Sequence, residues 1–190
     1  ISLFEELARE DGCWSGPRVA ASAHTRLLYA RGGQVHIDTA LFQPAGAPVI
    51  VVSGLPASGK DTWVATHARG QEVVSFDDAK AELGLKHGEN DGMAAHYAID
   101  KAKALLRKHT PFVWNATHLS DQMRSKTLDL LYAYHADVRL VYLEAAHDVV
   151  FARNHKRDTT LSNKDLARML HRWEVPLPWE AHVVEYQVQI

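Results

Sequence analysis

The chain has 190 residues, of which 46% are hydrophobic and 23% charged, and its formal net charge at pH 7 is −2. This length suits one ordinary domain, and this composition excludes a disordered chain and a collagen-like one. The net charge argues against a nonspecific nucleic-acid coat protein, although residues 153–172 hold six basic and two acidic side chains and therefore form a basic segment.

Cellular location is predicted from cysteine content and from the length of the apolar runs. The longest runs, such as residues 48–52, are far below the roughly 18 residues that cross a bilayer, and no basic-then-apolar leader is present. The single Cys13 cannot form an internal disulfide, so we expect a reducing, cytoplasmic location and no membrane partner. Because the chain begins at Ile1, we expect a processed chain or a piece of a longer one whose flanking domains are missing.

Apolar periodicity predicts two regions. Helical spacing at residues 2–10 and 18–30, followed by Gly and Pro up to residue 46, predicts a helical accessory segment over 1–46 and a second domain over 47–190. In the second domain short apolar runs alternate with amphipathic ones. The predicted strands are residues 49–53, 73–76, 112–115, 138–143 and 182–188. The predicted helices are residues 60–69, 79–83, 92–108, 121–135, 146–157 and 163–173. This order predicts an α/β fold with a parallel sheet of about five strands, covered by helices on both faces, and a site at the carboxyl ends of the strands.

A phosphate-binding loop follows the first predicted strand, in the sequence GLPASGKDT of residues 54–62. Gly54, Gly59 and Lys60 have P-loop spacing, in which backbone N–H groups surround a phosphate and the lysine supplies charge for the β- and γ-phosphates. The residues expected to contact the nucleotide are Gly54, Ala57, Ser58, Gly59, Lys60, Asp61 and Thr62. The alternative, a turn with an N-capping Asp, fits less well with strand, glycines, lysine and helix in this order.

Asp61 departs from the usual loop pattern. It stands where a Ser or Thr hydroxyl normally holds Mg²⁺, and the hydroxyl comes one residue later at Thr62. A carboxylate beside a triphosphate is repelled, so we expect Asp61 to face the metal, directly or through water.

An acceptor side is predicted after the second and third strands. Asp77 is placed to take a proton from an acceptor hydroxyl, and Lys80 to hold a phosphate of the acceptor, whereas Asp78 is expected to cap a short helix. Asn115, Thr117 and His118 follow the third strand and are expected to face the same cleft. For these three residues loop capping is the alternative, with Ser120 opening the next helix.

A helical lid is predicted near residues 153–172. Arg153 and Arg157 lie four residues apart and hence on one helical face, from which they can close over phosphates and neutralise the transferring group. The alternative is a solvated basic face. Trp173 and Trp179 are expected to pack in the interior rather than to stack on a base.

These ordered motifs resemble the P-loop polynucleotide 5′-hydroxyl kinases of the phage repair-enzyme type. The resemblance covers roughly residues 48–175 and rests on GLPASGKDTW (54–63), SFDDAK (75–80), NATHL (115–119) and RNHKR (153–157). It implies that Lys60 binds the donor phosphates, Asp77 is the general base, Lys80 contacts the acceptor phosphate, and Arg153 and Arg157 are lid arginines. Departures from the phage pattern are Asp61 in place of the loop Ser, Lys80 in place of Arg, and Ala116 in place of an acidic residue.

Within this group the chain is most similar to the kinase domain of bacterial RNA-repair proteins that join an HD phosphohydrolase to a 5′ kinase. The resemblance therefore implies a covalently linked upstream HD phosphohydrolase domain that this chain lacks. The expected function is transfer of the γ-phosphate of ATP or GTP, with Mg²⁺, to a 5′-hydroxyl end of RNA or DNA. A kinase of small metabolites or antibiotics and a non-catalytic nucleotide-binding module are the alternatives.

Overall fold

The computed structural model describes residues 19–42, 45–86, 89–156 and 161–189. The chain divides after Phe42 into two compact units, which we describe separately. The first contains helix α2 (Ala23–Ala30), which begins later than the predicted residue 18 because the Ser22 hydroxyl accepts the Thr25 N–H and caps it. The returning chain is held to this helix by the Thr25 hydroxyl, which donates to the Thr39 carbonyl at 2.6 Å and accepts from the Leu41 N–H at 3.0 Å. The predicted helix over 2–10 lies outside the described residues.

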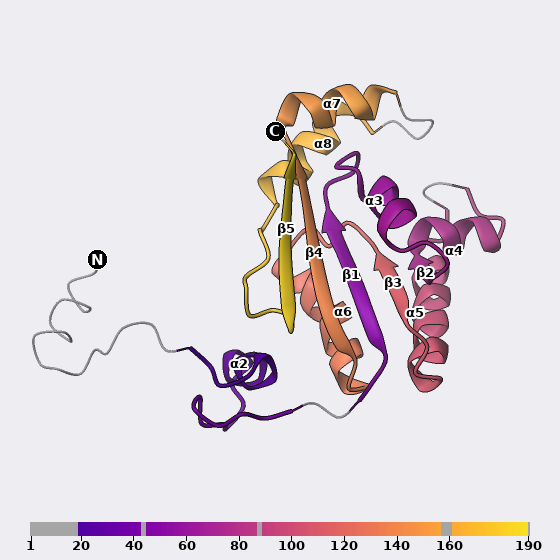
Figure 1. Ribbon diagram of the computed structural model, residues 1–190. Helices are drawn as coiled ribbons and strands as arrows, with labels where there is room; N and C mark the ends of the chain where they lie inside the picture. The colour runs from indigo at the N-terminus through magenta and orange to yellow at the C-terminus, as the bar shows by residue number, and fades with distance from the viewer. Residues whose placement is uncertain (1–18, 43–44, 87–88, 157–160, 190) are drawn as a thin grey trace, which may run out of the picture. The chain divides into compact units, whose positions relative to one another are not determined.

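The second unit is built on a five-stranded sheet in which every neighbouring pair is parallel (Figure 1). Its strands are β1 (Pro48–Gly54), β2 (Glu72–Ser75), β3 (Phe112–Asn115), β4 (Asp137–Ala145) and β5 (Val183–Gln189). The order across the sheet is β2-β3-β1-β4-β5, which puts β1 in the centre with Val51 paired to Trp114 on one side and to Leu140 on the other. This arrangement confirms the predicted fold class.

Six helices of the second unit lie in the described residues. They are α3 (Lys60–His67), α4 (Phe76–Glu82), α5 (Asp91–Arg107), α6 (Asp121–Ala133), α7 (His147–His155) and α8 (Asn163–His171). Among the described residues, no helix combines the length and the apolar character that a membrane span requires.

The start of α4 corrects two predictions. Phe76, expected to end a strand, begins the helix, and Asp78, expected to cap it, lies in its first turn. The reason is that the Ser75 hydroxyl accepts the Asp78 N–H at 2.9 Å and so caps the helix earlier.

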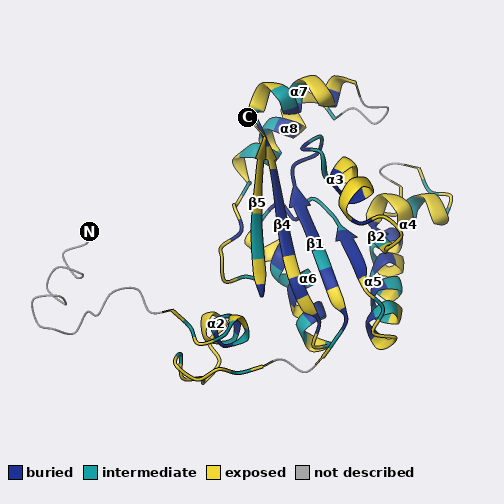
Figure 2. Ribbon diagram, in the orientation of Figure 1, coloured by how far each residue is buried: buried dark blue, intermediate teal, exposed yellow. Residues whose placement is uncertain are grey.

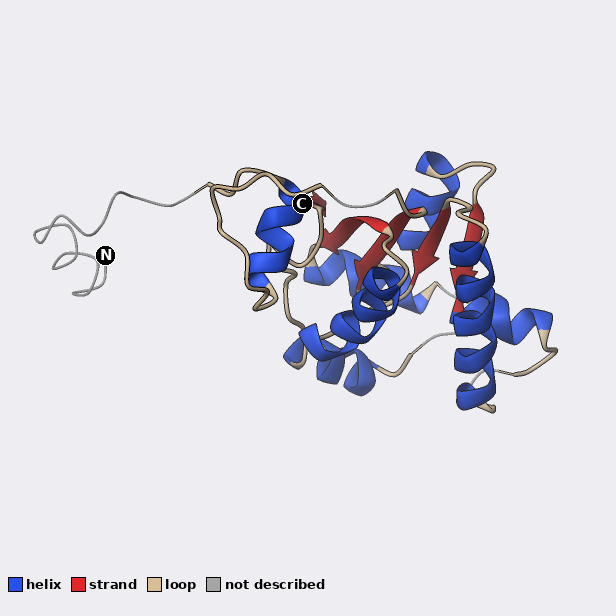
Figure 3. Ribbon diagram, turned by 90° about the horizontal axis from the view of Figure 1, so that it is seen from below, coloured by secondary structure: helices blue, strands red, loops and turns tan. Residues whose placement is uncertain are grey.

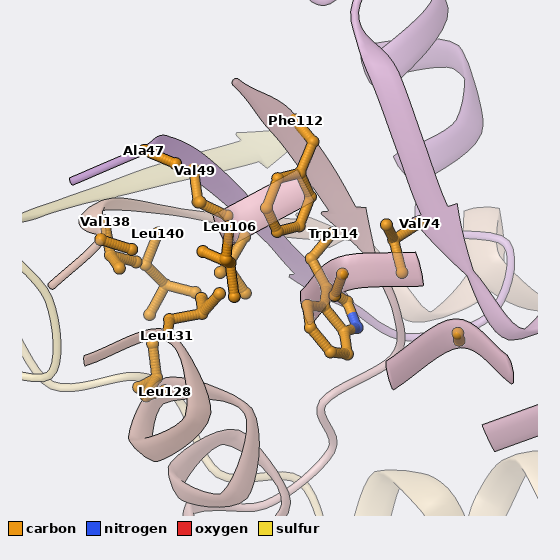
Figure 4. Close-up of a cluster of buried hydrophobic side chains, with 14 of the residues drawn as sticks. Ala47, Val49, Val74, Leu106, Phe112, Trp114, Leu128, Leu131, Val138 and Leu140 are labelled. Atoms are coloured by element: carbon orange, nitrogen blue, oxygen red, sulfur yellow. The ribbon is translucent and has the colours of Figure 1, made fainter. Parts of the chain in front are cut away.

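Helices lie on both faces of the sheet (Figure 3), and the residues of its central strands are largely buried (Figure 2). On one face Val49, Phe112, Trp114 and Leu140 pack with α5 and α6, as Figure 4 shows for Leu106, Leu128 and Leu131. On the other face the intervening residues, such as Val52, Val113 and Val141, pack with Trp63 and Val64 of α3. Because helices cover both faces of the sheet, the edge at the carboxyl ends of the strands is the part of the sheet where a ligand-binding site can form.

A buried ion pair ties the C-terminal segment to α6. Arg124, 1% exposed, donates from Nε and Nη2 to the carboxylate of Glu180, 8% exposed, at 2.7 and 3.0 Å. Its Nη1 donates to the carbonyls of Glu174 at 2.6 Å and His118 at 3.3 Å, so the same guanidinium holds the loop after β3.

The two C-terminal tryptophans differ from each other. Trp173 is partly buried and donates from Nε1 to the Tyr142 hydroxyl at 2.8 Å. Trp179, in contrast, is 45% exposed, so the expectation of interior packing is wrong for this residue.

Candidate active site

A cavity of about 1150 Å³ opens beside the carboxyl ends of β1, β2 and β3. Ligand pockets commonly measure roughly 300–1,000 Å³, so this one has room for a nucleotide and a second substrate. Most of the candidate residues from the sequence line it: Ala57, Gly59, Lys60, Asp61, Thr62, Asp77, Lys80, Asn115, Thr117 and Arg153. Gly54, Ser58 and His118 are outside its lining, and Arg157 lies outside the described residues.

The loop between β1 and α3 has the backbone that a phosphate cradle requires. Gly59 adopts a φ of +102° at the start of α3, a conformation that side-chain-bearing residues rarely adopt. A Cβ at Gly54 would lie 2.6 Å from both the Leu143 carbonyl oxygen and the Ser58 hydroxyl, so only glycine fits there. The Ser58 hydroxyl is buried and has no hydrogen-bond partner within the described chain. Gly54 and Ser58 therefore shape the loop from behind rather than from the cavity.

Lys60 folds over this loop. Its Nζ donates to the carbonyls of Gly54 at 2.9 Å and Leu55 at 2.8 Å. Its charge is thus held at the loop, where a nucleotide phosphate would replace the two carbonyl oxygens as the acceptor of the ammonium hydrogen bonds.

Asp61 is connected to the end of β3. The Asn115 amide donates from Nδ2 to the Asp61 carboxylate at 2.8 Å, while its Oδ1 is buried without a hydrogen-bond partner in the described structure. Asn115, predicted to contact the acceptor, lines the cavity and also contacts the residue predicted to face the metal. The pairing fixes the carboxylate on the cavity wall.

The first turns of α4 form the opposite wall. Asp77, Asp78 and Lys80 all line the cavity, together with Phe76, whose side chain is 40% exposed. Lys80 is only 14% exposed, and its Nζ lies 2.5 Å from the Asp91 carboxylate at the start of α5. The ammonium is thereby fixed one helical turn from Asp77.

The loop after β3 separates two of the predicted residues. Thr117 lines the cavity, and its carbonyl accepts the Gly54 N–H at 3.2 Å. His118 is 4% exposed and its Nε2 lies 3.0 Å from the Thr127 hydroxyl. Desolvation by burial, assisted by the charges of Arg124 and Lys60 and opposed by a backbone hydrogen bond with Val52, lowers the pKa of His118 to about 4. The expectation that His118 faces the cleft is therefore corrected, because tertiary packing closes this ring off.

Arg153, predicted to be a lid arginine, lies beside the phosphate loop. Its Nη1 would be 3.7 Å from a Cβ built on Gly59, and both Nη atoms donate to Oε1 of Gln189 at 3.2 Å. Ala57 of the loop packs against the buried Val150 and Leu166 of the two lid helices. The lid thus rests on the loop.

A buried side chain near the end of α7 is hydrogen-bonded to Leu161, in the segment that leads into α8. Asn154, fully buried, donates from Nδ2 to the Leu161 carbonyl at 2.8 Å and accepts the Leu161 N–H at 3.2 Å. Leu161 and Met169 then continue along the cavity wall.

Comparison with known proteins places this arrangement in a family. A model of the AAA domain family (AAA_33) matches residues 49–176, which contain all but the first residue of β1, the phosphate loop, α4, α7 and α8. The chain belongs to the AAA domain family. A search of curated proteins gave no match.

Solved structures share the fold of this AAA domain. A chain of the Pnkp1/Rnl/Hen1 RNA repair complex matches with a TM-score of 0.59 and 16% identity, and the match covers 73% of this chain and 46% of that one. Kti12 from Chaetomium thermophilum, in complex with ADP-AlF3, matches with a TM-score of 0.56 and 16% identity over 74% and 89%. A sugar kinase from Janibacter sp. HTCC2649 matches with a TM-score of 0.55 and 19% identity over 75% and 85%. At these identities the likeness shows a P-loop kinase-like fold, and the acceptor is a separate question.

Phe76 and Gln189 are among the cavity residues of the AAA domain that the sequence analysis did not identify. Phe76 looked like the last apolar residue of a strand, so its position at the cavity was hidden. Gln189 lies at the carboxyl end of the last strand, and the parallel topology alone would have placed it near the site.

Proposed function

We propose that this AAA domain is a polynucleotide 5′-hydroxyl kinase, which transfers the γ-phosphate of ATP or GTP to a 5′-hydroxyl end of RNA or DNA. The observation that carries the proposal is the placement of Asp77 and Lys80 one turn apart on α4, on the wall of the cavity that also contains the phosphate loop. Residues three apart on a helix are neighbours on its surface. A carboxylate and a cation so placed match an acceptor with a hydroxyl and a nearby phosphate, as in a nucleotide at a 5′ end.

The residues have distinct tasks in the proposed reaction. The acceptor 5′ oxygen forms a bond to the γ-phosphorus while the bond from that phosphorus to the β-phosphate oxygen breaks and releases a nucleoside diphosphate. Asp77 takes the proton of the hydroxyl, and Lys60 and Arg153 neutralise charge on the phosphates. Lys80 holds the phosphate on the 3′ side of the first acceptor nucleotide, in competition with its ion pair to Asp91.

The residues present fit Mg²⁺ bound together with the nucleotide. Mg²⁺ is usually held by one or two carboxylates plus substrate phosphates and water, and the described residues include no group of three or more His, Cys, Asp or Glu that would suggest another kind of centre. Asp61 offers one carboxylate at the loop, steadied by Asn115. When bound, the metal would neutralise charge on the β- and γ-phosphates.

Two further observations support a nucleotide acceptor. Phe76 presents an exposed aromatic ring to the cavity beside Asp77, and aromatic rings stack on bases of any sequence. Among the structural neighbours is a chain from an RNA repair complex. A sugar kinase has a comparable likeness, so the assay must include small metabolites.

The test is transfer of labelled γ-phosphate to a panel of acceptors with and without a phosphate. The panel contains 5′-hydroxyl RNA and DNA oligonucleotides, a nucleoside 3′-phosphate, the unphosphorylated nucleoside, and sugars. We expect labelling of the oligonucleotides and the nucleoside 3′-phosphate, with little labelling of the nucleoside. Transfer to a sugar and to no oligonucleotide would overturn the proposal in favour of a metabolite kinase.

Lys80 gives the assay a matched pair of variants. Lys80→Met should raise KM for acceptors that carry the 3′ phosphate and leave KM for the plain nucleoside unchanged. Lys103→Met, on the neighbouring helix α5 and outside the cavity lining, should change neither value. An equal rise in KM for all acceptors in the Lys80 variant would assign this residue a structural role.

Variants of two adjacent carboxylates test which residue accepts the proton of the acceptor hydroxyl. Asp77→Asn should lower kcat by roughly 10²-fold or more with nucleotide affinity near wild type, because general-base help is worth about 10²–10⁴-fold. Asp78→Asn should lower kcat far less. The reverse ranking would identify Asp78 as the base.

A further inference from the structure

The end of β5 contacts both ends of lid helix α7. The Ala146 N–H, just before the helix, donates to the Gln189 carbonyl oxygen at 3.1 Å. At the other end of α7, Arg153 donates from both Nη atoms to the side-chain Oε1 of the same Gln189 at 3.2 Å. Figure 1 shows the carboxyl end of β5 next to α7, and one residue thus links the last strand to this lid helix.

The link lies at the phosphate loop. A Cβ built on Gly59 would be 3.7 Å from Arg153 Nη1 and 4.0 Å from Gln189 Nε2, so both side chains border the backbone that surrounds the phosphates. Both residues also line the cavity. Arg153 is otherwise on the exposed surface of α7, where a long side chain has many rotamers. Gln189 therefore selects the rotamer that points the guanidinium at the loop.

The neutral amide of Gln189 is chemically suited to orienting the Arg153 guanidinium. A carboxylate at position 189 would form an ion pair with Arg153, offset its charge, and repel the nucleotide phosphates. A neutral amide oxygen holds the same guanidinium while leaving its full positive charge for the phosphates. The guanidinium keeps further N–H donors, since among the described residues a single acceptor atom, Oε1 of Gln189, contacts it.

We propose that Gln189 is a positioning residue for phosphoryl transfer, which holds the Arg153 guanidinium against the phosphate loop. The inference rests on the nucleotide-binding half of the proposed function and is independent of the acceptor. Gln189 acts through Arg153, and its removal leaves the catalytic arginine in place but poorly oriented.

The experiment measures affinity for a nucleoside triphosphate without acceptor, and kcat with whichever acceptor of the panel is labelled. Gln189→Met keeps the length of the side chain and removes the hydrogen bonds. We expect a roughly 3- to 10-fold loss in triphosphate affinity or in kcat, the range of one net hydrogen bond, with nucleoside monophosphate affinity unchanged. Gln189→Glu should lose more than Gln189→Met, because it adds a negative charge beside the phosphates.

Gln187 is the matched control. It is the same residue type, two positions earlier on the same strand and hence on the same face, and it does not line the cavity. Gln187→Met should leave affinity and kcat unchanged. The urea midpoint of unfolding should stay near wild type for both variants, since both side chains are exposed.

A double-mutant cycle decides whether Gln189 acts through Arg153. In the Arg153→Met background, Gln189→Met should have no further effect on triphosphate affinity or kcat. A full additional loss in that background, an equal loss in Gln187→Met, or no loss in Gln189→Met would overturn the proposal. Because triphosphate affinity is measured without acceptor, a failure to label oligonucleotides would count against the proposed function alone.

Discussion

Two bidentate Arg–Glu pairs in the described part of the chain predict very different losses of stability. Arg124–Glu180 and Arg139–Glu185 have nearly equal geometry, with shortest contacts of 2.7 Å in each. The first pair is 1% and 8% exposed, whereas the second is 46% and 32% exposed. Arg124→Met leaves the Glu180 carboxylate buried without its cation, which typically costs about 3–5 kcal/mol. Arg139→Met breaks a solvated pair, worth about 0–1 kcal/mol.

The assay is equilibrium unfolding in urea. With a slope of about 2 kcal/mol per M, Arg124→Met should lower the midpoint by roughly 2 M, and Arg139→Met by at most about 0.5 M. Adding Glu180→Leu to Arg124→Met should recover part of the loss, because no unpaired charge is then buried. Equal midpoint shifts for the two arginine variants would refute the reasoning that burial, rather than pair geometry, sets the cost.

Three more predictions concern the site and the buried His118 beside it. The pKa of His118 is about 4 in the folded protein and about 6.5 when the ring is exposed, so below pH 6.5 the unfolded chain binds a proton that the folded chain does not. The free energy of unfolding, measured in urea titrations, should therefore fall by about 2 kcal/mol from pH 7 to pH 5. An equally steep loss in His118→Gln would assign the effect to other groups. Gly59→Ala should cost about 1–3 kcal/mol of unfolding free energy and weaken nucleotide binding, since alanine is strained at a φ of +102°, and a wild-type urea midpoint would contradict this. Asp61→Ala should raise the Mg²⁺ concentration needed for half-maximal activity, and Asp61→Ser should bring that concentration part of the way back to the wild-type value. Asn115→Ala should raise it by a smaller amount, because the Asp61 carboxylate loses its hydrogen-bond donor. Unchanged metal dependence in Asp61→Ala would leave Asp61 without a metal role.

The strands and the phosphate loop could be predicted because their sequence signals are local. Strands buried on both faces are continuous apolar runs, as in the residues of β1, and a P-loop has glycines and a lysine at fixed spacing. The start of α4 could not be predicted in this way. Ser75 and Asp78 are both good N-cap residues, and only the structure shows that the serine hydroxyl makes the capping bond.

Contacts between distant segments explain the other differences. His118 is a polar residue in a loop after a strand, but its carbonyl accepts a hydrogen bond from Arg124, which pairs with Glu180, and its ring contacts Thr127 of α6. The contact between Asn115 and Asp61 joins residues 54 positions apart, so no local pattern could reveal it. The position of Gln189 follows only once β5 is known to pair with β4 in parallel.

Asn154 has a consequence for how the sequence of this AAA domain can vary. Its two hydrogen bonds to Leu161 pin those two positions together, so the residues between them can change in number without displacing Arg153 on one side or Met169 on the other. Lengthening a loop whose ends are already fixed costs little, on the order of 0.6 kcal/mol for each doubling. A change in the number of intervening residues can therefore leave the cavity residues Arg153, Leu161 and Met169 in register with one another, because the hydrogen bonds of Asn154 set their spacing independently of the segment's length.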